Sequence, residues 1–124
     1  MDRQQIGLDI FHELLPDVQN VGQQSPDSIA PELGNLSLEY AFGTLWSREG
    51  LDRRSRSLVT LGILIALRAS KELSFHFPIA MTNGLSKEEI DEVIYHATAY
   101  AGFPAASEAA NVAKTVLKKE EKHD

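Results

Sequence analysis

The sequence predicts an all-α protein, and three observations support that prediction. Apolar residues recur at spacings of three and four along most of the chain, and no long segment shows the period of two that a half-buried strand requires. Glycine, proline and Asn-Gly signals divide the periodic segments into stretches of helical length. The 124 residues suit one domain with a modest core. We therefore expect six helices in a single domain over residues 1–124, with an N-terminal helix and linker (1–27), a core (28–117) and a charged tail (118–124).

The first two helices are separated by a polar segment. The first covers about residues 3–15 and ends at Pro16, because a proline interrupts the helical hydrogen bonds. The turn-rich segment 17–27 is expected to be a linker, and the second helix begins near Ser28. The residues that the second helix is expected to direct toward the interior are Leu33, Leu36, Tyr40, Phe42, Leu45 and Trp46.

The third and fourth helices carry the most apolar part of the chain. The third has Asp52 as a plausible N-cap and is apolar on most faces over residues 58–67, so we expect it to be the central helix. The fourth covers residues 71–82 and ends at Asn83-Gly84, a pair suited to the positive φ of a helix stop.

The fifth helix has the clearest start signal in the sequence. Ser86 and Glu89 form the S-x-x-E pattern of a capping box. Gly102 is expected to end this helix, and Pro104 to begin a sixth that continues to Leu117. The residues that the fifth helix is expected to direct inward are Ile90, Val93, Ile94, Ala97 and Tyr100.

Pro78 conflicts with the helical pattern around it. In a helix interior it removes one hydrogen bond and crowds the carbonyl four residues earlier, at Ser74. Two explanations are open, a helix that starts late or a helix that kinks beside His76. A late start is the simpler expectation, and a kink would place a freed carbonyl next to an imidazole.

Composition excludes several classes of function. The formal net charge of −6 argues against nucleic acid or an anionic membrane as the main partner. There is no cysteine, which excludes disulfides, thiolate metal sites and thiol nucleophiles. The N-terminus lacks the pattern of a secretory signal, so the expected location is the cytoplasm. The longest apolar run, residues 58–67, is about half of what a membrane span needs.

Two of the four histidines, His76 and His96, lie on apolar helices where water should be scarce. An imidazole titrates near neutrality, so such a pair is a candidate acid/base centre. The alternative is that each is a histidine at the edge of the core, bonded to a backbone carbonyl. Together with Glu72 or Glu92 they do not match a known metal signature, and we expect neither metal nor cofactor.

A basic cluster precedes the third helix in this acidic chain. Arginines can bind carboxylates through paired hydrogen bonds, so the cluster is a candidate site for an acidic substrate. The alternative is a solvated helix start paired with nearby Asp and Glu. Its members are Arg48, Arg53, Arg54 and Arg56.

Several blocks in order resemble the carboxymuconolactone decarboxylase family, the cysteine-free relatives of the alkylhydroperoxidase-D peroxidases. The blocks are E-L-x-x-H at residues 72–76, N-G-x-S-x-E-E-I at 83–90 and H-x-x-x-Y-x-G-x-P-A-A at 96–106. The resemblance covers about residues 33–117. It implies a six-helix alkylhydroperoxidase-D-like bundle that assembles into a ring-like homo-oligomer, often a trimer or hexamer.

The resemblance also separates two activities. The positions of the paired peroxidase cysteines fall on Ala69 and Glu72, so thiol peroxidase activity is excluded for this chain acting alone. The decarboxylase branch fits better and implies cofactor-independent removal of carbon dioxide from a small carboxylated lactone, a step of aromatic-compound breakdown. On that reading His76 is the general acid/base, His96 donates to the lactone or positions it, and Glu72 orients His76 and raises its pKa.

The resemblance assigns substrate contacts as well. We expect Arg48 or one of Arg53, Arg54 and Arg56 to hold a substrate carboxylate, with Ser57, Trp46 and Tyr100 as weaker candidates for pocket lining. Pro78 stands where family decarboxylases often carry an arginine, which argues against the standard dicarboxylate lactone. Two alternatives stay open: a non-enzymatic oligomeric binding protein for small aromatic or acidic metabolites, and a subunit of a redox system whose cysteines come from another protein.

Overall fold

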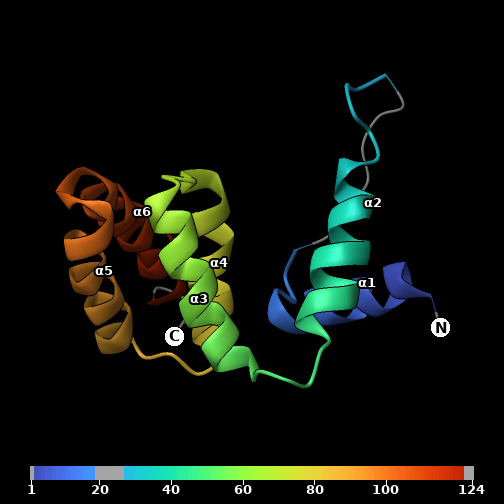
Figure 1. Ribbon diagram of the computed structural model, residues 1–124, viewed down its shortest axis with the longest axis horizontal. Coiled ribbons are helices and arrows are strands. Elements are labelled where there is room, and N and C mark those ends of the chain that lie inside the picture. Colours follow the sequence, from blue (N-terminus) through green and yellow to red (C-terminus); the bar gives the residue numbers. More distant parts are fainter. Residues whose placement is uncertain (1, 19–26, 122–124) are drawn as a thin grey trace. The chain divides into compact units, whose positions relative to one another are not determined.

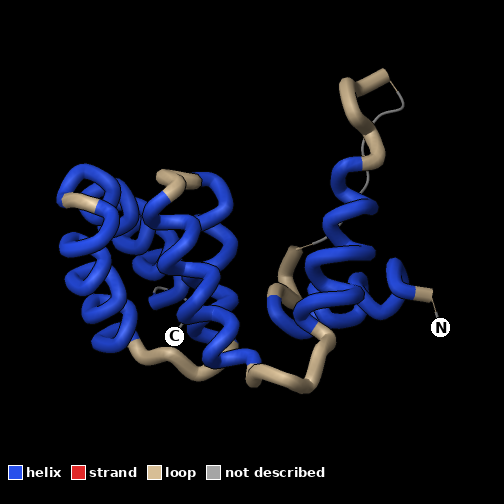
Figure 2. Tube along the Cα trace, in the orientation of Figure 1, coloured by secondary structure: helices blue, strands red, loops and turns tan. Residues whose placement is uncertain are grey.

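The computed structural model describes residues 2–18 and 27–121, without the side chains of 119–121, and over these residues it contains helices and connecting loops but no strand (Figure 2). The all-α prediction is therefore confirmed. The chain divides into two compact units, Met1–Asp52 and Arg53–Asp124. The expected core over residues 28–117 stays a prediction, and the boundary between the two units lies after Asp52. A single domain stays a prediction.

The first unit contains α1 (Arg3–Leu14), α2 (Leu33–Ser37) and a π-helix, η1 (Leu38–Trp46) (Figure 1). The backbones of α1 and η1 cross so closely that only glycine fits. A Cβ atom built on Gly7 would lie 1.8 Å from the carbonyl oxygen of Leu38. A Cβ on Gly43 would lie 2.1 Å from the carbonyl oxygen of Arg3. Gly7 on α1 and Gly43 on η1 are therefore both required for the packing of the first unit.

The prediction for the second helix was partly wrong. It begins at Leu33 rather than near Ser28, because Ala30 has a φ of 53° that ends any regular turn before it. From Leu38 onward it is π-helical, so side chains rotate through a different angle per residue than a 3.6-residue period assumes. Of the side chains expected inside, Phe42 and Trp46 are buried, whereas the exposed ones are Leu33, Leu36, Tyr40 and Leu45.

The second unit is a four-helix bundle of α3 (Arg53–Ala66), α4 (Ser70–Thr82), α5 (Lys87–Ala101) and α6 (Phe103–Glu121). α3 and α6 each pack against both α4 and α5, so they form its middle, with α4 and α5 on either side (Figure 1). Its core joins buried residues of all four helices, among them Leu61, Ile65, Leu73, Phe77, Ile90, Ile94 and Ala109.

The turns of the second unit follow the local signals of the sequence. Ser86 and Glu89 form the predicted capping box, with bonds of 3.1 Å and 3.0 Å between each side chain and the other residue's backbone N–H. Gly84 has a φ of 99° and Gly102 a φ of 95°, values that favour glycine. The predicted stops of α4 and α5 are thus confirmed.

Pro78 lies inside α4, which runs from Ser70 to Thr82. The favoured expectation of a late helix start is therefore wrong. The core explains why the helix tolerates a proline: Phe77 and Ile79, on either side of Pro78, are fully buried. Their packing holds the segment in helical geometry although one backbone hydrogen bond is missing.

Candidate functional site

His76 lies on α4 beside Phe77, and burial is the dominant influence on its chemistry. The side chain is partly buried and its Nδ1 atom is fully buried. Desolvation lowers the pKa of His76 to about 4, because an apolar environment disfavours the charged imidazolium. At neutral pH the ring is therefore neutral, with one nitrogen that donates a hydrogen bond and one that accepts.

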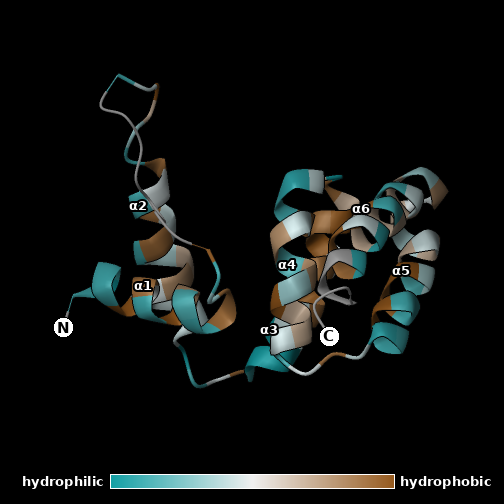
Figure 3. Cartoon of the chain, turned by 180° about the vertical axis from the view of Figure 1, so that it is seen from behind, coloured by the Kyte–Doolittle hydropathy of each residue, from teal (hydrophilic) through white to brown (hydrophobic). Residues whose placement is uncertain are grey.

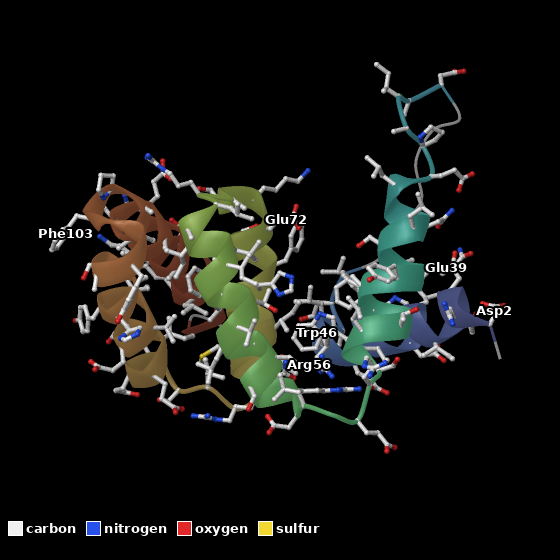
Figure 4. The ribbon with its side chains drawn as sticks, in the orientation of Figure 1. Asp2, Glu39, Trp46, Arg56, Glu72 and Phe103 are labelled. Atoms are coloured by element: carbon white, nitrogen blue, oxygen red, sulfur yellow. The ribbon has the colours of Figure 1, made fainter. Side chains whose placement is uncertain are left out.

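Glu72 lies one turn before His76 on α4 and is exposed to solvent (Figure 4). We expected its carboxylate to raise the pKa of His76. That expectation was wrong, because the pKa is lowered and desolvation is the cause. Water around Glu72 screens its charge, so the attraction that an i, i+4 pair offers is weak here.

His96 was expected in a water-poor position, and that expectation was also wrong. Both His96 and Tyr100 are exposed on α5, Tyr100 by 82% of its surface. The two rings pack against each other with centroids 5.2 Å apart and planes tilted by 40°. Both side chains line a groove between α3 and α5, which we call the α3–α5 groove.

The α3–α5 groove has a volume of about 1080 Å³. Apolar side chains of α3 and α5 form most of its lining, and three glutamates lie at the end where α5 begins, which Figure 3 colours as hydrophilic. Arg54 is ion-paired with one of them, Glu89. With Glu88 and Glu92 also at the groove, carboxylates outnumber cations there, which disfavours a doubly negative substrate. The full lining is Arg54, Leu58, Gly62, Ala66, Glu88, Glu89, Glu92, Val93, Tyr95, His96, Ala97, Ala99, Tyr100 and Ala101.

The structure does not bring the two candidate histidines into one cavity of a single chain. His96 and Tyr100 line the α3–α5 groove, whereas His76 and Glu72 lie on α4 and do not. α3 and α6 separate these two helices.

Ser57, a candidate for pocket lining, is instead fully packed, with 1% of its surface exposed. Its Oγ accepts a hydrogen bond of 2.9 Å from Nδ2 of Asn83, and the same amide donates to the Arg53 carbonyl oxygen at 3.4 Å. Sequence reasoning assigned Asn83 only to a helix stop. These two hydrogen bonds of Asn83 connect the end of α4 to the first residues of α3.

The remaining candidates for substrate contact are divided between the two units. Arg53 and Arg56 lie in the first turn of α3 and are partly buried. Figure 4 labels Arg56. Trp46 is buried in the first unit, where its ring stacks on Phe42 at 6.4 Å, and Arg48 follows it on the surface of that unit.

Two further properties concern metal binding and membrane spans in the described part of the chain. Over residues 2–18 and 27–121 there is no group of three His, Asp or Glu side chains arranged to hold a metal ion. Across the same stretches, every helix is too short or too polar to cross a membrane.

Comparison with known proteins adds a family to this geometry. Residues 31–115 match the carboxymuconolactone decarboxylase family. Over 113 residues the chain is 36% identical to a 4-carboxymuconolactone decarboxylase of Acinetobacter baylyi, covering 90% of this chain and 84% of that protein. Over 82 residues it is 44% identical to a nitrosuccinic acid decarboxylase of Metarhizium robertsii, covering 66% and 57% respectively. An uncharacterized 15.0 kDa protein of Paracoccus denitrificans is 28% identical over 119 residues, covering 94% and 89%.

Proposed function

This chain belongs to the carboxymuconolactone decarboxylase family, and we propose that it is a cofactor-independent decarboxylase of a small carboxylated lactone or a related acid. The two named relatives are both decarboxylases, which supports a decarboxylase-like role. Their names specify different acids, so the shared feature is the reaction rather than the substrate. Pro78, at a position where an arginine is common in the family, favours an acid other than the standard dicarboxylate lactone.

The observation that carries the proposal is the environment of His76. An imidazole kept neutral by desolvation can donate one hydrogen bond and accept another at the pH of the cell. Its surroundings have a low polarity, in which a hydrogen bond to a developing negative charge is worth more than in water.

The reaction needs little beyond such a group. When a carboxylated unsaturated lactone loses carbon dioxide, the bond to the carboxyl carbon breaks and its electron pair delocalises into the lactone carbonyl. His76 donates a hydrogen bond to that oxygen. The negative charge of a bound carboxylate raises the pKa of His76, so the ring takes up a proton on binding and transfers it to carbon.

Other residues have supporting roles in this proposal. In this proposal His96 and Tyr100 reach the lactone from a second copy of the chain, because one chain does not bring them into a cavity with His76, and the arginine cluster holds a carboxylate. Glu72 orients His76. We also propose that the chain forms a homo-oligomer, because one chain leaves His96 exposed in an open groove.

Carbon dioxide release from a panel of monocarboxylated unsaturated lactones and β-keto acids tests this function, with the dicarboxylates 4-carboxymuconolactone and nitrosuccinic acid as comparison substrates. We expect turnover by wild type and a decrease of kcat by about 10²–10⁴-fold in His76→Gln, the range for loss of a general acid/base. His12→Gln is the matched control, since His12 is an exposed histidine on α1. Saturable binding of acids from this panel without carbon dioxide release would contradict the proposal and favour the non-enzymatic binding protein.

A further inference from the structure

Asn83 follows the last residue of α4 and connects this helix to α3 through its side-chain amide. Its Nδ2 atom donates a hydrogen bond of 2.9 Å to Oγ of Ser57 and a longer, weaker one of 3.4 Å to the carbonyl oxygen of Arg53. Ser57 is 1% exposed, and a buried hydroxyl group is normally hydrogen-bonded. The bond between Asn83 and Ser57 therefore fixes one point of contact between the two helices.

The same bond determines which part of α3 lies beside His76. Asn83 comes seven residues after His76, nearly two turns, so the two side chains lie on the same side of α4 and about 10 Å apart along its axis. α3 and α4 pack side by side and run in opposite directions, since only residues 67–69 connect them (Figure 1). With Ser57 beside Asn83, we expect residues 60–64 of α3 to lie at the level of His76.

This part of α3 presents few polar atoms that could solvate an imidazole. Leu64 is partly buried and packs against the core of the unit. Thr60 is also partly buried, and its hydroxyl group already donates to the carbonyl oxygen of Arg56 at 2.8 Å. Such surroundings agree with the desolvation that lowers the pKa of His76. We therefore expect the imidazole to lose apolar cover if α4 moves along α3.

Pro78 increases the importance of the contact at Asn83. It lies between His76 and Asn83 and removes one backbone hydrogen bond, so α4 bends more easily at this point. Beyond Pro78 the fully buried Ile79 holds the helix through apolar contacts, which have no direction of their own. A hydrogen bond requires a particular distance and angle. The amide of Asn83 therefore fixes the position of the last turn of α4 more closely than burial alone does.

We infer that Asn83 is a positioning residue, which holds α4 along α3 through its bond to Ser57 so that the imidazole of His76 stays against the apolar side of α3. The inference rests on the proposed function, in which His76 donates a hydrogen bond to the lactone oxygen. It adds Asn83 to that site without any contact to the substrate. It also gives a role to the buried hydroxyl group of Ser57, which points to Asn83 rather than to a ligand.

An NMR titration of His76 in two variants tests the positioning. Asn83→Ala and Ser57→Ala each remove the bond between the helices, from opposite sides. In both variants we expect the pKa of His76 to rise from about 4 to about 5, because water gains access to the ring. Ser57→Ala decides the question if Asn83→Ala does not fold.

Ile90→Val is the matched control, because it removes one buried methyl group from the core and leaves the bond between Asn83 and Ser57 intact. Its cost in stability is similar, so His76 should keep its wild-type pKa. Charged residues on α4 and on the helices packed against it are the same in all variants and do not account for a difference; they include Glu72, Arg53, Arg56 and Glu108. An unchanged pKa of His76 in a folded Asn83→Ala or in Ser57→Ala, or an equal rise in Ile90→Val, would overturn the inference.

Kinetics separate a positioning role from a general loss of stability. With the acid that wild type decarboxylates fastest, we expect kcat of Asn83→Ala to decrease about tenfold and KM to change little, because a displaced imidazole weakens stabilisation of the transition state rather than substrate binding. Asn83→Ala combined with Ser57→Ala should lose no more activity than either single variant, as one shared bond requires. Additive losses, or a raised KM with unchanged kcat, would contradict the positioning role.

The two proposals fail separately. Carbon dioxide release by wild type, together with an unchanged pKa of His76 in Asn83→Ala, would sink the positioning role alone. A raised pKa of His76 in that variant, with no carbon dioxide release by wild type, would sink the decarboxylase alone.

Discussion

α4 and α5 each carry one candidate histidine, yet they give the two imidazoles opposite surroundings. His76 on α4 is partly buried beside fully buried Phe77, and desolvation lowers its pKa to about 4. His96 on α5 is exposed and packs against the ring of exposed Tyr100. The difference shows that an apolar helix does not by itself make a histidine reactive. What matters is whether the side of the helix that carries it is covered.

The largest expected difference between α4 and α5 is in how much the packing of each helix contributes to the free energy of unfolding. Phe77→Ala should lower the free energy of unfolding by about 3–5 kcal/mol, because it leaves a cavity in the core. Tyr100→Ala should change it by about 0.5 kcal/mol or less. Urea unfolding of wild type and the two variants measures both costs. Equal costs would show that the α5 face is covered within one chain.

The response to acid should come from the α4 side. The unfolded chain binds a proton at His76 near pH 6.5, whereas the folded chain binds it only near pH 4, so stability decreases as the pH falls between these values. The expected loss is up to about 3 kcal/mol. Unfolding by urea at several pH values should show this loss in wild type and a correspondingly smaller one in His76→Gln. The same slope in both proteins would contradict the desolvation of His76.

A smaller difference concerns the polar interactions that connect α4 and α5 to α3, a hydrogen bond for α4 and an ion pair for α5. Ser57→Ala breaks the partly buried hydrogen bond from Asn83 at the end of α4 and should cost about 1–2 kcal/mol. Arg54→Ala breaks the exposed ion pair to Glu89 on α5 and should cost less than about 1 kcal/mol. Thermal unfolding of the two variants measures the difference. A larger cost for Arg54→Ala would reverse the ranking of the two sides.

Features decided by a few neighbouring residues were predictable from the sequence. Ser86 and Glu89 specify a helix start, and Gly84 and Gly102 specify stops, because each signal acts within about one turn. The four helices of the second unit follow from these signals together with apolar periodicity.

Features that depend on distant segments were not predictable. Periodicity indicates that Val59, Ile63 and Tyr100 favour an apolar surface, but it does not say whether their own chain provides it. The π-helix at Leu38–Trp46 and the helical geometry at Pro78 both depend on packing that local propensity does not contain.

The candidate site also combines features that the sequence predicts with features that only the structure shows. The sequence singled out His76 correctly as an imidazole in apolar surroundings, but it could not rank the two influences on its pKa. A carboxylate at Glu72 would raise that pKa and burial would lower it. Only the structure shows that Glu72 is exposed and that desolvation therefore dominates.

The most direct test of this account is an NMR titration of the imidazole of His76 in the folded, substrate-free protein. We predict a pKa of about 4 for His76, with His76→Gln used to assign the resonance. A pKa at or above the ordinary value of about 6.5 would show that the ring is not desolvated, and it would remove the observation on which the proposed acid/base role of His76 rests.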